Sequence, residues 1–155
     1  MTRIETVTIV HQHPRILLGM KKKKFGKGRY NGFDGKVETN ETEKEAAIRE
    51  TFEEAGIKII NPEKKGIILF EFQTDEQDHL VHFFKANKYS GNPVESNEMI
   101  PKWFNINKIP YDQMWADDRY WLPLLIEGKK FQGNFVFDKN HKIVKYTLEE
   151  NAYLK

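Results

Sequence analysis

Apolar and polar residues alternate in several short stretches of the chain, and turn-forming residues separate these stretches. Alternation of this kind is typical of β-strands that bury one face. Residues 4–10 and 15–20 show it on either side of a turn that contains Pro14. Two apolar and aromatic stretches, 66–74 and 80–88, flank a polar loop and therefore predict a hairpin. Further strands are predicted at residues 30–38, 58–60, 102–105, 131–137 and 143–148.

A helix is predicted where strong helix formers predominate, from residue 43 to residue 55. Thr42 stands before this stretch and Glu45 follows three positions later, which is the spacing of a capping box. Gly56 stands where a helix commonly ends with a glycine. The local sequence therefore predicts both ends of this helix.

A second helix is predicted at residues 117–127, with Asp117 or Asp118 as its N-cap. Strands interspersed with two helices predict an α+β fold, in which a mixed β-sheet is sandwiched between helices in α/β/α layers. At 155 residues the chain suits one domain, and we predict a single domain over 1–155.

The first predicted helix separates an acidic arc from an apolar arc on a helical wheel. Acidic residues three or four positions apart on a helix repel each other by a few tenths of a kcal/mol per pair. Several acids on one arc therefore indicate a compensating cation. Hard divalent ions such as Mg²⁺ take carboxylate ligands and also bind substrate phosphates. The alternative is a solvated acidic face with Lys44 and Arg49 as local partners. The acidic arc carries Glu43, Glu50, Glu53 and Glu54, and the arc expected to face a core carries Ala47, Ile48, Thr51, Phe52 and Ala55.

Composition narrows the functional classes. The net charge is +2, which provides no overall field for polymeric nucleic acid or an anionic membrane. Cysteine is absent, which excludes disulfides and thiol chemistry. The first ten residues lack the pattern of a signal peptide, and no apolar stretch approaches the length of a membrane span. We therefore expect a cytoplasmic, monomeric protein.

The spacing of glycine and charged residues around the first predicted helix resembles the Nudix box. The family prefers a bulky aliphatic residue where Thr51 stands, so the resemblance has one departure within the box. The matching positions are Gly35, Glu41, Arg49, Glu50, Glu53, Glu54, Gly56 and Ile57.

Segments outside the box resemble one group within the Nudix family, the animal homologues of MutT, which are oxidised-purine nucleoside triphosphatases. The resemblance implies Mg²⁺-dependent hydrolysis of triphosphates of the 8-oxo-dGTP and 2-hydroxy-dATP type to a nucleoside monophosphate and pyrophosphate, with Mn²⁺ as a possible substitute. This reaction sanitises the nucleotide pool. The segments cover residues 17–22, 31–33, 70–72, 93–96, 114–118 and 146–148.

Two other functions stay open at this point. One is a Nudix pyrophosphohydrolase that acts on methylated purine triphosphates or on another nucleoside diphosphate derivative. The other is a Nudix-like nucleotide-binding module without activity, against which the intact Glu50, Glu53 and Glu54 argue.

The resemblance also implies roles for individual residues. The catalytic residues and metal ligands are Glu50, Glu53, Glu54 and Glu98, and Asp34 is a further metal residue that replaces a glycine of the family. Arg49 is expected to orient the glutamates through a bidentate pair rather than touch substrate. The residues expected at the substrate are Thr6, Lys21, Asn31, Phe33, Asp34, Gly35, Lys36, Phe70, Trp115, Ala116, Asp117 and Asp118.

The base of the nucleotide requires a flat apolar slot and a few directed polar groups. Trp115, with Phe25 and Phe70, is expected to form the slot. Asn31 offers both a donor and an acceptor to a purine edge. Asp117 and Asp118 are adjacent carboxyl groups, one of which is expected to retain a proton and so donate a hydrogen bond.

The histidines do not predict a metal site. His79 and His82 are three positions apart on a predicted strand, so they point to opposite faces and a shared zinc ion is not expected. His11, His13 and His141 fall in predicted turns and are expected at the surface.

Overall fold

The computed structural model describes residues 1–150 and 153–154. The predicted domain range 1–155 also includes residues 151, 152 and 155, which lie outside the described residues. Two helices accompany the strands, α1 (Glu43–Ala55) and α2 (Asp118–Ile126), together with the short 3₁₀ turns η1 (Ile106–Lys108) and η2 (Tyr111–Gln113). The strands are β1 (Arg3–Gln12), β2 (Arg15–Lys21), β3 (Tyr30–Asn31), β4 (Phe33–Lys36), β5 (Lys58–Ile59), β6 (Glu63–Phe72), β7 (His79–Ala86), β8 (Tyr89–Ser90), β9 (Met99–Asn105), β10 (Phe131–Phe137) and β11 (Ile143–Glu150).

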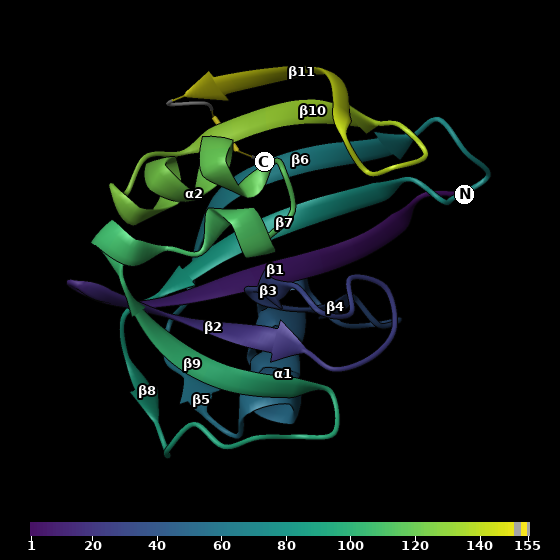
Figure 1. The fold of residues 1–155 in the computed structure, drawn as a ribbon. Coiled ribbons are helices and arrows are strands. Elements are labelled where there is room, and N and C mark those ends of the chain that lie inside the picture. Colours follow the sequence, from purple (N-terminus) through teal and green to yellow (C-terminus); the bar gives the residue numbers. More distant parts are fainter. Residues whose placement is uncertain (151–152, 155) are drawn as a thin grey trace.

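Nine of the described strands form one mixed sheet, in which seven follow the order β11-β10-β6-β7-β1-β2-β3 and the other two, β4 and β9, pair with β1 and β2 (Figure 1). Strands β1 and β7 pair in parallel, as do β6 and β10, whereas the other pairs are antiparallel. The sheet branches at β1, whose residues 5–8 pair with β4 and whose residues 10–12 pair with β2. Strand β9 continues the sheet from β2, and β5 and β8 form a separate small ladder.

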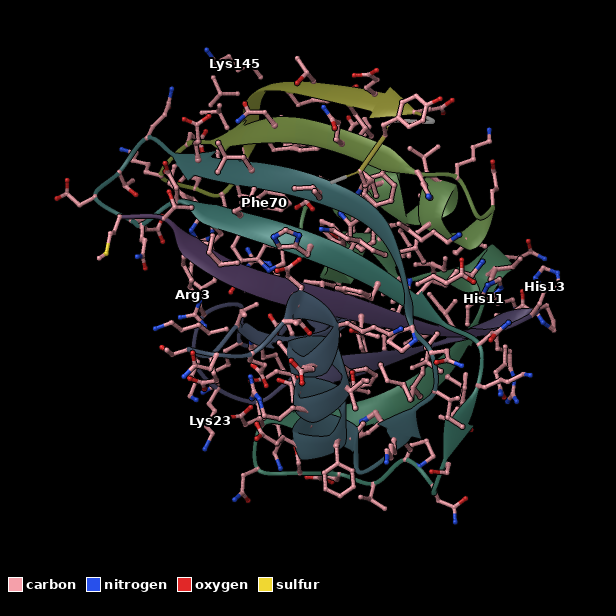
Figure 2. All side chains as sticks on the ribbon, turned by 180° about the vertical axis from the view of Figure 1, so that it is seen from behind. Arg3, His11, His13, Lys23, Phe70 and Lys145 are labelled. Carbon is pink, nitrogen blue, oxygen red and sulfur yellow. The ribbon has the colours of Figure 1, made fainter. Side chains whose placement is uncertain are left out.

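The two helices cover opposite faces of the sheet. Helix α2 lies in front of the sheet in Figure 1, and α1 lies in front in Figure 2, which is seen from behind. Trp121, Leu122 and Leu125 of α2 pack into one buried cluster with β6, β7 and β10. A second cluster joins Ala55 of α1 and the adjacent Ile57 to β1, β2 and β4. The predicted α/β/α layers are therefore confirmed.

Helix α1 has the predicted ends. Thr42 and Glu45 form a complete capping box, and Gly56 closes the helix in the left-handed conformation, with φ of 73°. Thr51 is fully buried, and its hydroxyl donates to the carbonyl of Ala47 at 2.7 Å, so the polar group at this departure from the family pattern has a partner.

Several predictions about local environment were wrong. Phe52 is 58% exposed, because the buried face of α1 is formed by Ala46, Ala47, Thr51, Glu54 and Ala55 instead. His11 does not lie in a turn but within β1, where it is buried. Strand β9 begins at Met99 and continues through Pro101, which an edge strand tolerates because its outer side requires no hydrogen bonds.

Candidate active site

A cavity of about 590 Å³ opens between the β-sheet, α1 and the loop that follows β2. Charged side chains from α1, β2 and β4 line one end, and aromatic side chains from the loop, β6 and the segment before α2 line the other. The chain therefore places a polar end and an aromatic end within one space, as the sequence predicts.

Glu50 reaches the polar end of the cavity because Gly35 leaves room for it. A Cβ atom built on Gly35 would lie 2.0 Å from Cδ of Glu50, closer than two carbon atoms can approach. Glu54 lies one turn further along α1 and accepts a hydrogen bond at 2.8 Å from the backbone N–H of Asp34. Helix α1 and strand β4 are thus joined through two of the predicted catalytic glutamates.

Arg49 orients the acidic residues of α1, as predicted. Its Nη1 atom donates to Glu50 at 2.5 Å and to Glu53 at 3.4 Å. The bidentate pair, however, is with Glu41, at 2.7 and 2.8 Å from Nε and Nη2. A further bond to the carbonyl of Lys36 at 2.9 Å ties this network to the end of β4.

Lys21, at the end of β2, and Lys24, in the loop that follows, pair with predicted metal residues. Lys21 Nζ contacts both carboxylate oxygens of Asp34, at 3.1 and 3.2 Å. Burial disfavours the charge of Lys21, but the carboxylates of Asp34, Glu54 and Glu5 raise its pKa above the ordinary value. Lys24 contacts Glu98 at 3.1 Å, and this bond lowers the pKa of Glu98.

The acids of α1 lie in surroundings that disfavour their negative charge. Burial and the carboxylate of Asp34 raise the pKa of Glu54 to about 10, against the smaller effect of Lys21. Burial also raises the pKa of Glu50, although Arg49 opposes it. A hydrogen bond with Glu54 contributes to the low pKa of Glu98, which places these two acids together. An added cation would stabilise the ionised form of this cluster.

Oxygen-donor side chains of this kind suit a hard divalent ion. In residues 1–150 and 153–154 no three histidine or acidic side chains already converge as a metal cage does. Arg49 and Lys24 instead bind the carboxylates of Glu50, Glu53 and Glu98. Glu54 is buried, and the nearby cation Lys21 does not fully compensate its negative charge. This observation fits a metal ion at the site.

Trp115 is the centre of the aromatic end. Phe25 stacks on it with ring centroids 5.0 Å apart and an interplanar angle of 26°. The guanidinium group of Arg29 lies 4.1 Å from the ring centroid, which is a cation–π contact. His141, predicted at the surface, packs 4.7 Å from Trp115. Phe70 also lines the cavity, so the three predicted slot residues are brought together.

Asp117 and Asp118 are buried and line the cavity. Asp117 occupies the N-cap position of α2, as predicted, but its side chain makes no capping bond and instead accepts from Nε1 of Trp121 at 2.7 Å. Burial raises the pKa of both acids, and the neighbouring Asp117 raises that of Asp118 further, well above its ordinary value. These surroundings favour a proton retained by the pair.

Most, but not all, of the predicted substrate residues line the cavity. Thr6 and Phe33 are fully buried and are not among the residues that line it, so their contact with substrate stays a prediction. Ala116 packs against the core cluster of α2 instead. The predicted residues that do line the cavity are Lys21, Asn31, Asp34, Gly35, Lys36, Phe70, Trp115, Asp117 and Asp118, with Glu50, Glu53, Glu54 and Glu98.

The lining also contains residues that sequence analysis did not assign to the site. Arg3, Glu5 and His79 form part of the rim. Neighbouring residues on a strand point to opposite faces, and Thr6 does not line the cavity. The alternation of β1 could therefore have indicated Glu5 as a lining residue. The pairing of Glu5 with His79 had no local signal, because the two residues belong to different strands.

Comparison with known proteins agrees with this geometry. The NUDIX domain model matches residues 2–125, and the chain therefore belongs to the Nudix family. Nudix hydrolases generally need a divalent metal ion, typically Mg²⁺. No helix in the described ranges is both long and apolar enough to cross a membrane.

Among individual relatives, the chain is similar to oxidized purine nucleoside triphosphate hydrolases. It is 48% identical over 149 residues to the enzyme of Danio rerio and 46% identical over 149 residues to that of Mus musculus, with 96% of each chain covered in both cases. The crystal structure of a MutT protein from Bacillus halodurans superimposes with a TM-score of 0.86 at 26% identity, covering 95% of this chain and 97% of the other.

Proposed function

We propose that this protein hydrolyses oxidised purine nucleoside triphosphates, of the 8-oxo-dGTP and 2-hydroxy-dATP type, to the nucleoside monophosphate and pyrophosphate. The observation that carries the proposal is one cavity with crowded carboxylates at one end and an aromatic slot with a carboxyl pair at the other. A nucleoside triphosphate has the same two parts, a charged chain and a flat base. The relatives from Danio rerio and Mus musculus, named for this activity, support it.

The polar end suits the triphosphate and its metal ion. When bound, a divalent ion such as Mg²⁺, or Mn²⁺ in its place, neutralises charge on phosphate oxygens and activates water. Lys21, held in its charged form by the acids around it, is available to pair with a phosphate oxygen. Arg49 keeps the carboxylates of α1 in position. The metal ligands proposed are Glu50, Glu53, Glu54 and Glu98, and Asp34, which pairs with Lys21, is proposed as a further metal residue.

The aromatic end suits an altered purine. Trp115 offers a face for stacking, and Asn31 supplies a donor and an acceptor at the cavity wall. A proton retained by Asp117 and Asp118 lets the pair donate one hydrogen bond and accept others. Oxidation changes which atoms of a purine edge donate and accept, so a pair with both capacities accommodates more than one oxidised base.

Pyrophosphate release measured with Mg²⁺ on a panel of triphosphates tests the proposal. We expect 8-oxo-dGTP and 2-hydroxy-dATP to have higher kcat/KM values than unmodified dGTP and dATP. A preference for methylated purine triphosphates would favour the other Nudix activity. An enzyme that hydrolyses no member of the panel would contradict both.

A further inference from the structure

Three side chains that the proposed reaction does not use form a hydrogen-bonded chain at the cavity rim. Arg3 Nε donates to Oε2 of Glu5 at 2.8 Å, and His79 Nδ1 lies 2.6 Å from Oε1 of the same carboxylate. The parallel pairing of β1 with β7 brings them together, since Arg3 is opposite His79 in the register. All three line the cavity, and Figure 2 shows Arg3 on the same side of the molecule as Lys23, which also lines it.

The hydrogen bond to Glu5 determines which nitrogen of the His79 ring carries a proton. Burial raises the pKa of Glu5, but His79 and Arg3 lower it more, so the net pKa is below its ordinary value and Glu5 is ionised. An ionised carboxylate only accepts hydrogen bonds, so the hydrogen lies on Nδ1 of His79. The other nitrogen, Nε2, has no partner among residues 1–150 and 153–154, and it is not among the buried unpaired atoms.

His79 lies between the two ends of the cavity. The centroid of its ring lies 5.5 Å from that of Phe25 and 5.7 Å from that of Phe72, at the aromatic end. Its partner Glu5 is close enough to Lys21 and Asp34, at the polar end, to change the pKa of both. In a nucleotide the sugar lies between the base and the phosphates, so His79 is placed at the sugar.

We propose that Nε2 of His79 contacts a sugar hydroxyl of the bound nucleotide and that Glu5 is its positioning residue. This inference rests on the proposed function, because it requires a nucleotide in the cavity. A hydroxyl is the suitable partner because it donates to a neutral imidazole and accepts from a charged one. His79 is thus a specificity-determining residue for the sugar, and Arg3 holds Glu5 toward it.

The test compares ribo-, 2′-deoxy- and 2′,3′-dideoxy-forms of one oxidised purine triphosphate. We expect the wild-type enzyme to lose on the order of 3- to 10-fold in kcat/KM when the contacted hydroxyl is absent, as for one neutral hydrogen bond. His79→Ala removes this discrimination, whereas His79→Gln, whose amide reaches toward the position of Nε2, restores part of it. Glu5→Gln weakens it, because an amide no longer dictates the tautomer of His79.

His82→Ala is the matched control, because His82 lies on the same strand with its side chain near Glu43 of α1 and outside the cavity. It is expected to retain the wild-type discrimination. A thermal unfolding curve for each variant shows whether it is folded. The ¹⁵N chemical shifts of the His79 ring provide a readout that is independent of turnover, and a ring with an unprotonated Nδ1 overturns the inference.

Three outcomes of the kinetic test contradict the inference. If the wild-type enzyme hydrolyses oxidised purine triphosphates but does not discriminate among the three sugars, no hydroxyl is contacted. If His79→Ala retains the discrimination, His79 is not responsible. In both cases the proposed function stands. If no purine triphosphate is hydrolysed, the proposed function fails and this inference fails with it.

Discussion

Glu54 is the residue in which the fold and the proposed chemistry are most closely coupled. Its side chain is 1% exposed, and its pKa is raised to about 10 by burial and by Asp34. A carboxyl group in such surroundings keeps its proton until a cation compensates the charge. The same residue therefore weakens the metal-free fold at high pH and offers a strong ligand to a metal ion.

The raised pKa of Glu54 predicts how stability changes with pH. Below about pH 4.5 the group is protonated in the folded and the unfolded chain, and its contribution to stability is complete. As the pH rises toward about 10 the unfolded chain loses this proton first, so the free energy of unfolding decreases. We expect Glu54→Gln, unfolded thermally in EDTA between pH 5 and 9, to lose less stability than the wild type. Parallel curves for the two proteins would contradict the shift.

The same substitution tests the proposed role of Glu54 in the reaction. Glu54→Gln keeps the size of the side chain but removes a charged ligand and a candidate base. We expect kcat to decrease on the order of 10²- to 10⁴-fold with the fold retained. Glu45→Gln, on the exposed first turn of α1, is the matched control and should leave kcat unchanged. Full activity in Glu54→Gln would refute the role.

At the aromatic end, a substitution of Asp117 should change the selectivity among substrates and not the rate alone. Asp117→Asn keeps an acceptor for Trp121 but replaces a carboxyl group that can share a proton with Asp118 by an amide that cannot. We expect the kcat/KM ratio between 8-oxo-dGTP and 2-hydroxy-dATP to change on the order of tenfold. An unchanged ratio, measured on the same panel, would argue against a role in recognising the base.

At the scale of elements, α1 contributes both to the hydrophobic core and to the cavity. Its buried face packs on the sheet, and its acidic face borders the cavity. The capping box at its first turn sets where the helix begins, and Gly56 sets where it ends. Because Glu50 and Glu54 are positioned by the length and rotation of this helix, its ends also position the site.

The capping box gives a prediction for the stability of α1. Thr42→Ala removes the acceptor of the Glu45 N–H bond, which measures 3.1 Å. We expect the free energy of unfolding to decrease by about 1 kcal/mol, the usual effect of losing such a cap. Glu45→Gln preserves the reciprocal bond to the backbone of Thr42 and should change stability much less. Denaturant unfolding of the three proteins measures both effects, and equal stability for Thr42→Ala and the wild type would contradict the assignment.

At the scale of the whole molecule, the cavity exists because the sheet branches at β1. The register places Asp34 opposite Val7 and Gly35 opposite Thr6, which brings β4 beside the acids of α1. The aromatic end comes from the loop after β2 and the segment before α2. No single element contains both ends of the site.

Removal of the metal ion should therefore affect the stability of the whole chain. Mg²⁺ that binds only the folded protein stabilises it by about 2.7 kcal/mol at a hundredfold excess over Kd. For a chain of this length that amounts to a rise in Tm of roughly 5–11 °C, measured without nucleotide and reversed by EDTA. Glu54→Gln should show a smaller rise. Absence of any rise, together with no magnesium uptake by calorimetry, would contradict a metal site among these acids.

The sequence alone predicted most of the elements and the chemistry proposed for the site. Helix α1 matches its predicted range because Thr42, Glu45 and Gly56 act within one turn of its ends. The predicted glutamates and most of the predicted substrate residues line one cavity, since the Nudix box spaces its acids along a single helix.

Only the tertiary structure decided which side chains face the cavity and which are covered. Phe52 is exposed and Thr6 is buried against expectation, because burial depends on neighbours from other strands. The pair of Glu5 and His79 forms between β1 and β7, 74 residues apart in the chain. Local patterns act within a few residues, whereas a cavity is formed by distant segments that only folding brings together.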